Sequence, residues 1–197
     1  MFTSVEAVLE YAKLLPSRIA VTVSVPARHA IVQMAWVVDD LEDAARRWHQ
    51  TTGIGPFLVN RHIPIREPLY RGAPGAVDFS TAIAQAGPVQ IELVQQHDDA
   101  PSCYRDSVPK GSEAMHHVAI MAPDYETTVA GYVAQGFEVA SAGHFGTARF
   151  CYVDCRPALG HMVEILEECA AIQNFFAAIV RAADEWDGDP AGLLREL

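Results

Sequence analysis

The stretch Gln33-Met-Ala-Trp-Val-Val-Asp-Asp40-Leu-Glu decides the fold, because it occurs again later as His117-Val-Ala-Ile-Met-Ala-Pro-Asp124-Tyr-Glu. In both copies a polar residue precedes a mostly apolar stretch, and an aspartate follows that polar residue seven positions later. Internal repetition of this kind predicts an architecture built from related units. The sequence therefore predicts two similar modules in one chain.

Each copy continues into an amphipathic helix. The residues that share one apolar face are Leu41, Ala44, Ala45 and Trp48 in the first copy, and Tyr125, Val129, Tyr132 and Val133 in the second. Asp40 and Asp124 suit the N-cap position, because a carboxylate accepts hydrogen bonds from free backbone N–H groups. Gly53 and Gly136 are typical of helix ends.

The two copies also end alike. Val89-Gln-Ile-Glu92-Leu-Val is similar to His161-Met-Val-Glu164-Ile-Leu, with one glutamate inside an apolar strand. Further strands are expected at residues 56–63 and 76–84, and at 137–145 and 148–155. Each half is therefore predicted to run strand–helix–strand–strand–strand.

The domain organisation follows from this repeat. We expect an N-terminal helical extension (1–28), a first module (29–96), an acidic proline-containing linker (97–115), a second module (116–168), and a C-terminal helix and tail (169–197). Helices are expected over Ser4–Leu15 and Cys169–Trp186. Their apolar faces predict packing against the modules or the contact of a homodimer.

The charge balance limits the partners. The chain has 14 Lys and Arg against 25 Asp and Glu, a net charge of −11, which argues against nucleic acid or an anionic membrane as partner. The sequence contains no apolar run long enough for a membrane helix. Glu6 and Glu10 lie where an export signal would be apolar. We therefore expect a cytoplasmic protein whose four cysteines are thiols.

Four polar residues in the apolar strands are the candidate site. Because side chains alternate across a strand, Gln33, Glu92, His117 and Glu164 are expected to point away from the helix-covered face. Buried carboxylates are costly unless they are paired or bind a metal. Each residue alone could simply bind backbone or water, but all four in register predict one divalent ion such as Zn, Ni, Co or Mn. Alternation places His116 on the opposite face, so it is not assigned as a ligand.

These features resemble the vicinal oxygen chelate superfamily over about residues 31–168. This superfamily includes glyoxalase I, methylmalonyl-CoA epimerase, extradiol dioxygenases and bleomycin-resistance proteins. The segments Gly87-Pro-Val-Gln-Ile-Glu-Leu, Pro101-Ser-Cys-Tyr and His116-His117-Val are especially similar to the glyoxalase and epimerase branch. The resemblance implies an α+β fold, in which two βαβββ modules form a cupped mixed β-sheet with helices outside.

The resemblance also implies a ligand set and a chemistry. The ligands would be Gln33, Glu92, His117 and Glu164, from the first and last strand of each module. Many relatives have histidine at the position of Gln33, which counts against an extradiol dioxygenase with two histidines and one carboxylate. The expected function is a metal-dependent isomerase or lyase that enolises a carbonyl or acyl-CoA thioester, with Glu164 first and Glu92 second as the base.

Several functions remain open from the sequence. An activity like that of methylmalonyl-CoA epimerase is favoured by the resemblance alone. The alternatives are a lactoylglutathione lyase of the glyoxalase I type, a non-enzymatic ligand-sequestering protein of the bleomycin-resistance type, and an extradiol-type dioxygenase, which is disfavoured.

The segment at residues 60–72 bears on the substrate. It concentrates Arg61, Arg66 and Arg71 in an acidic chain, which predicts binding of an anionic group, although a solvated loop is the alternative. The expected pocket faces carry apolar residues such as Ala35 and Met162. We therefore predict a small anionic substrate with an apolar portion.

Overall fold

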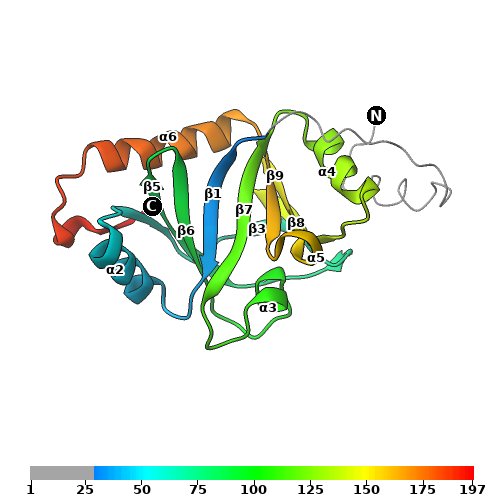
Figure 1. The fold of residues 1–197 in the computed structure, drawn as a ribbon, viewed down its shortest axis with the longest axis horizontal. Helices are drawn as coiled ribbons and strands as arrows, with labels where there is room; N and C mark the ends of the chain where they lie inside the picture. Colours follow the sequence, from blue (N-terminus) through cyan, green and yellow to red (C-terminus); the bar gives the residue numbers. More distant parts are fainter. Residues whose placement is uncertain (1–28) are drawn as a thin grey trace.

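The computed structural model describes residues 29–197, so the helix expected over Ser4–Leu15 lies outside the described residues. These residues form one 11-stranded mixed sheet, in the order β11-β2-β5-β6-β1-β7-β10-β9-β8-β3-β4. Figure 1 shows the curved sheet at the centre of the molecule, with helices around its periphery.

The two predicted βαβββ modules are both present. The first contains β1 (Ile31–Val37), α2 (Leu41–Thr52), β2 (Phe57–Asn60), β5 (Phe79–Ala86) and β6 (Val89–Gln96). The second contains β7 (Ala114–Ala122), α4 (Tyr125–Ala134), β8 (Val139–Phe145), β9 (Ala148–Val153) and β10 (Met162–Glu167). Parallel pairing joins β1 to β6 and β7 to β10, and the antiparallel pair β1–β7 joins the modules. The predicted fold class is confirmed.

Local sequence explains where the module helices begin and end. The Asp40 side chain accepts a hydrogen bond from Asp43 N at 2.8 Å, and Asp124 accepts one from Thr127 N at 3.0 Å. Gly53 ends α2 in the left-handed conformation at φ 77°, where a side chain would be strained. Both predicted N-caps are therefore confirmed.

The segment 60–72, which the sequence suggests is a loop, contains the strand β3 (Ile65–Tyr70), and the short strand β4 (Ala73–Pro74) follows it. β3 pairs antiparallel with β8 of the other module, and Ile65 lies opposite Phe145. The loop interpretation is wrong here because Pro68 falls where the ladder is interrupted, between Arg66 and Leu69, and proline is tolerated at such an irregularity. A piece of the first module thus covers the edge of the second.

The C-terminal region contains α5 (Arg156–Leu159), α6 (Ala170–Asp184), a 3₁₀ turn η1 (Pro190–Gly192) and β11 (Leu194–Glu196). The apolar face of α6 lies largely against the protein's own sheet, where Ile179 packs with Leu58 and Ile83. That face therefore no longer argues for a subunit contact, and the homodimer stays a prediction. Among the helices of residues 29–197, none is long and apolar enough to cross a membrane.

Candidate metal centre and pocket

The centre of the sheet brings the four predicted ligands onto one face. Strand pairing across β6, β1, β7 and β10 forms two rows of neighbours: Glu92, Ala35, His117 and Met162 in one, and Gln90, Gln33, Ala119 and Glu164 in the next. Paired residues share a face, and so do residues two apart along a strand. Ala35 and Ala119 occupy the middle of these rows, and their small side chains leave room between the ligands.

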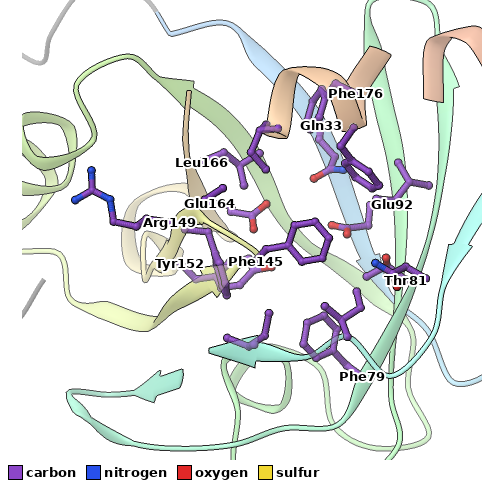
Figure 2. A pocket seen from close by; sticks show the side chains of 18 residues that line it. Gln33, Phe79, Thr81, Glu92, Phe145, Arg149, Tyr152, Glu164, Leu166 and Phe176 are labelled. Carbon is purple, nitrogen blue, oxygen red and sulfur yellow. The ribbon is translucent and has the colours of Figure 1, made fainter. Parts of the chain in front are cut away.

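The predicted ligands converge in space. Ligand atoms of Glu92, His117 and Glu164 all lie within 4.8 Å of one another, and all three residues are buried. His117 Nε2 is 3.3 Å from an Oε2 atom of each carboxylate. Figure 2 shows Gln33 beside Glu92 and Glu164, with all three side chains directed into one pocket. A hydrogen bond of 3.3 Å from Gln33 Nε2 to Gln90 Oε1 holds the carboxamide.

Two buried polar atoms show that this group fits a divalent metal ion. His117 Nε2 and Glu92 Oε2 are shielded from solvent and have no hydrogen-bond partner of good geometry among the described residues. With a neutral His117 these atoms lose water without a well-formed hydrogen bond in return, which destabilises the fold unless a proton or a metal ion lies between them. An imidazole nitrogen, two carboxylates and an amide oxygen are competent ligands for the later first-row divalent metals.

The other side of His117 contacts His116 through a β-bulge. Ala35 pairs with His117 and Trp36 pairs with Met115, so His116 is an extra residue in β7. A bulge breaks the alternation of side chains. The expectation that His116 points to the opposite face is therefore wrong, because its Nδ1 lies 2.9 Å from His117 Nδ1.

Hydrogen bonding determines which ring nitrogens carry protons. His116 Nε2 lies 2.9 Å from the carbonyl oxygen of Cys103, which can only accept, so Nε2 carries the hydrogen. In a neutral ring the Nδ1 atom of His116 then accepts a hydrogen bond from His117 Nδ1–H. This leaves the Nε2 lone pair of neutral His117 directed at the two carboxylates. Burial, aided by His117, lowers the pKa of His116 to about 3 and keeps it neutral.

The charges of the group are strongly coupled. Burial lowers the pKa of His117, but the close contacts of its ring with the negatively charged carboxylates of Glu164 and Glu92 outweigh burial and raise the pKa to about 9. Burial also raises the pKa of Glu92, against the opposing effect of His117. Without a metal ion, a proton on His117 therefore balances part of the carboxylate charge at neutral pH.

The ligand group opens into an apolar pocket with about 630 Å³ of empty space, part of it open to solvent. Its aromatic lining residues are Phe79, Phe145, Phe150, Tyr152, Phe175 and Phe176. Tyr152 also packs against His117, with 4.9 Å between ring centroids. The sequence analysis did not assign these aromatic residues to the site. Phe175 and Phe176 could have been suspected, because they lie on the apolar face expected for α6.

Comparison with known proteins agrees with this geometry. A family model described as the glyoxalase/bleomycin resistance protein/dioxygenase superfamily matches residues 32–152 of the chain. The chain belongs to this superfamily.

Solved structures of similar fold include two informative cases. Methylmalonyl-CoA epimerase from Mycobacterium tuberculosis is 15% identical, with a TM-score of 0.52 over 73% of this chain and 91% of that chain. A hypothetical protein from Bacillus halodurans is 16% identical, with a TM-score of 0.52 over 72% of this chain and 95% of that chain. At these identities the likeness shows the fold alone. A comparison with curated protein sequences gives no match.

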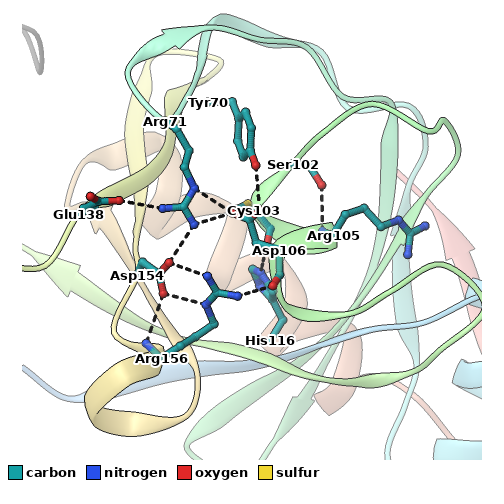
Figure 3. Close-up of polar contacts among 10 residues, drawn as sticks. All are labelled: Tyr70, Arg71, Ser102, Cys103, Arg105, Asp106, His116, Glu138, Asp154 and Arg156. Atoms are coloured by element: carbon teal, nitrogen blue, oxygen red, sulfur yellow. Dashed lines mark hydrogen bonds and ion pairs between the residues drawn. The ribbon is translucent and has the colours of Figure 1, made fainter.

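The three arginines predicted to bind substrate do not line the apolar pocket above the ligand group. Arg71 forms ion pairs with Asp106 at 2.7 Å, Asp154 at 2.8 Å and Glu138 at 2.9 Å, as Figure 3 shows. Arg61 pairs with Glu42 and Glu196. Arg66 is exposed and forms no ion pair within the described part of the chain. Substrate binding by these residues remains a prediction.

A second group of metal-competent side chains lies on the surface. Ligand atoms of His62, Asp78 and His97 also lie within 4.8 Å of one another, but all three residues are exposed. His62 Nδ1 already contacts Asp78 at 2.7 Å, and His97 Nε2 contacts Ser80 Oγ at 2.7 Å. Water can satisfy the remaining atoms, so nothing in this group calls for a metal ion. It provides a useful control for the buried one.

Proposed function

We propose that this protein binds one divalent metal ion through Gln33, Glu92, His117 and Glu164 and acts as an isomerase or lyase that enolises a carbonyl or thioester substrate. The observation that carries the proposal is the buried group of Glu92, His117 and Glu164, whose ligand atoms lie within 4.8 Å of one another and whose two carboxylates line an apolar pocket. Buried ionisable groups with strongly perturbed pKa values in a cleft are typical of functional sites.

The residues have distinct roles in this proposal. Gln33 and His117 would hold the ion together with the two carboxylates. When bound, the ion would supply Lewis-acid stabilisation of negative charge developing on a substrate oxygen. A carboxylate oxygen of Glu164 would take the proton from the carbon beside the carbonyl, and Glu92 is the second candidate for this base. The aromatic lining would exclude bulk water from that carbon.

The fate of the proton separates two activities. Return of the proton to the same carbon on its other face inverts the centre, which is epimerase chemistry. Delivery to the neighbouring carbon is the isomerisation performed on a hemithioacetal by a glyoxalase-type lyase. We favour the epimerase type, supported by the linker and the terminal strands of the modules, which resemble the epimerases more closely than the glyoxalases.

The two other functions have less support. A ligand-sequestering protein needs an apolar pocket but has no use for a buried group of two carboxylates and an imidazole. An extradiol dioxygenase needs a second histidine where this chain has Gln33. Uptake of oxygen by the iron-loaded protein with a catechol would restore that alternative.

Hydrogen–deuterium exchange tests the proposal. The metal-loaded protein in D₂O should introduce deuterium at the carbon beside the carbonyl of a 2-substituted acyl thioester or of a hemithioacetal. Glu164→Gln should abolish this exchange while the protein stays folded, because glutamine can still coordinate but is not a base. Glu168→Gln is the matched control, since Glu168 is exposed and close in sequence. Undiminished exchange by Glu164→Gln would remove Glu164 from the mechanism.

A further inference from the structure

Helix α6 completes the pocket above the ligand group. Ile172, Phe175 and Phe176 of α6 line the pocket together with Phe145 at the end of β8. The ring centroids of Phe145 and Phe175 are 5.9 Å apart, and those of Phe175 and Phe176 are 6.4 Å apart. Figure 2 shows the rings of Phe145 and Phe176 beside the carboxylates of Glu164 and Glu92.

The part of α6 that covers the pocket is held against the sheet at several points along the helix. Ile172 is 4% exposed and Ile179 is 1% exposed, and Ile179 packs against Leu58 of β2 and Ile83 of β5. The chain beyond the helix returns as β11, which pairs in parallel with β2. The aromatic side chains of α6 are therefore held over the pocket by the fold itself.

Apart from the proposed metal ion, the described residues that line the pocket offer no unpaired positive charge. Arg149 is the cationic side chain among the described residues that line it, and its guanidinium pairs with Glu126 and, at 2.6 Å, with Glu167. Figure 2 shows this guanidinium directed away from Glu92 and Glu164. An anionic group at the far end of a substrate's substituent, away from the proposed metal ion, would thus lie among aromatic rings, where no side chain of the lining compensates for its lost hydration.

We infer that the substrate places an uncharged apolar substituent about the size of a phenyl ring among Phe145, Phe175 and Phe176, with its carbonyl oxygen toward Glu92, His117 and Glu164. This inference rests on the proposed function and narrows its substrate class. A substrate whose substituent ends in a carboxylate is disfavoured by the same geometry. Aromatic rings surrounding one apolar group give favourable edge and face contacts in addition to burial.

Small hydroxamic acids test the inference, because they chelate a bound metal ion and differ only in their substituent. The zinc-loaded protein is titrated calorimetrically with acetohydroxamate, benzohydroxamate and the monohydroxamate of succinic acid. Benzohydroxamate should bind about tenfold or more tightly than acetohydroxamate, since burial of a phenyl group contributes at least that factor. The succinic monohydroxamate should bind no more tightly than acetohydroxamate.

Variants of α6 locate the effect. Phe175→Ala and Phe176→Ala should reduce the preference for benzohydroxamate severalfold while acetohydroxamate binding stays the same. Phe137→Ala is the matched control, because Phe137 packs against Tyr132 and does not line this pocket. Melting temperatures verify folding, and Phe176→Leu replaces Phe176→Ala if the latter unfolds.

The outcomes distinguish the inferred substrate class from the proposed function. A metal-loaded protein that binds all three hydroxamates equally, or prefers the succinic one, overturns the substrate class and leaves the proposed function standing. An unchanged preference in both α6 variants also overturns the inference. Failure to bind metal at all overturns the proposed function itself.

Discussion

His116 Nδ1 and His117 Nδ1 lie 2.9 Å apart, so two consecutive residues of one strand share a hydrogen bond. The bulge in β7 makes this contact possible. On its other side, the His116 ring donates a hydrogen bond from Nε2 to the carbonyl oxygen of Cys103. Cys103 begins α3 (Cys103–Ser107) in the segment between the modules. The linker thus helps to orient the central imidazole of the site.

The first prediction concerns His116. His116→Phe should weaken metal binding by roughly 10–100-fold, because the partner that fixes the tautomer and orientation of His117 is lost. Calorimetric titration with Zn²⁺ measures the affinity, and nitrogen-15 correlation spectra of the imidazoles report the tautomer. His49→Gln is the control, since the His49 ring also contacts a backbone carbonyl but lies outside the site. Equal zinc affinity in wild type and His116→Phe would show that His116 has no such role.

The second prediction concerns pH. The metal-free protein holds a proton on His117, whose pKa is raised to about 9, and a metal ion must displace that proton. Metal affinity should therefore rise with pH, by about tenfold per unit between pH 6 and 8, with one proton released per ion bound. Titrations in buffers of different ionisation enthalpy count the protons. An affinity independent of pH would contradict a protonated His117.

The third prediction concerns Arg71. Its three ion pairs join the turn after β3 to α3 and to the segments around Glu138 and Asp154. Arg156 and Arg71 together hold the pKa of Asp154 well below its usual range. We expect Arg71→Ala to lower the free energy of unfolding by roughly 1–3 kcal/mol. Arg66→Ala, at an exposed residue of β3, should change this free energy little.

Substrate kinetics of the same two variants decide whether either arginine binds an anion. The sequence predicts that loss of Arg71 raises KM, whereas its ion pairs favour a structural role. A tenfold rise in KM for Arg71→Ala at unchanged stability would support the substrate role. A rise for Arg66→Ala alone would assign anion binding to Arg66.

The sequence was sufficient for the two repeated modules and for placing the four candidate ligands on one face, because both depend on local periodicity, whereas the cupped arrangement of the modules was implied by the family resemblance. The repeat around Gln33 and His117 specifies two equivalent strands, and alternation then sends Gln33, Glu92, His117 and Glu164 to one face. The capping aspartates likewise act within a few residues of themselves. These features need no knowledge of distant partners.

What could not be predicted depends on contacts between distant segments. The bulge at His116 exists only in the register between β7 and β1. The partners of Arg71 come from separate parts of the chain, and the strand containing Pro68 forms because β8 is beside it. The periodicity of α6 showed that Ile172 and Phe176 would be covered, but not that the space beneath them would be the pocket.

Elemental analysis of protein purified without chelator shows whether the buried group of Gln33, Glu92, His117 and Glu164 holds a metal ion. Wild type should carry about one transition-metal ion per chain, and His117→Ala should carry almost none, because the only nitrogen ligand of the proposed set is lost. His97→Ala, which disrupts the exposed surface group, should retain the metal. A metal-free wild type that also fails to bind added Zn²⁺, Ni²⁺, Co²⁺ or Mn²⁺, or a His117→Ala variant with its full metal content, would contradict the account.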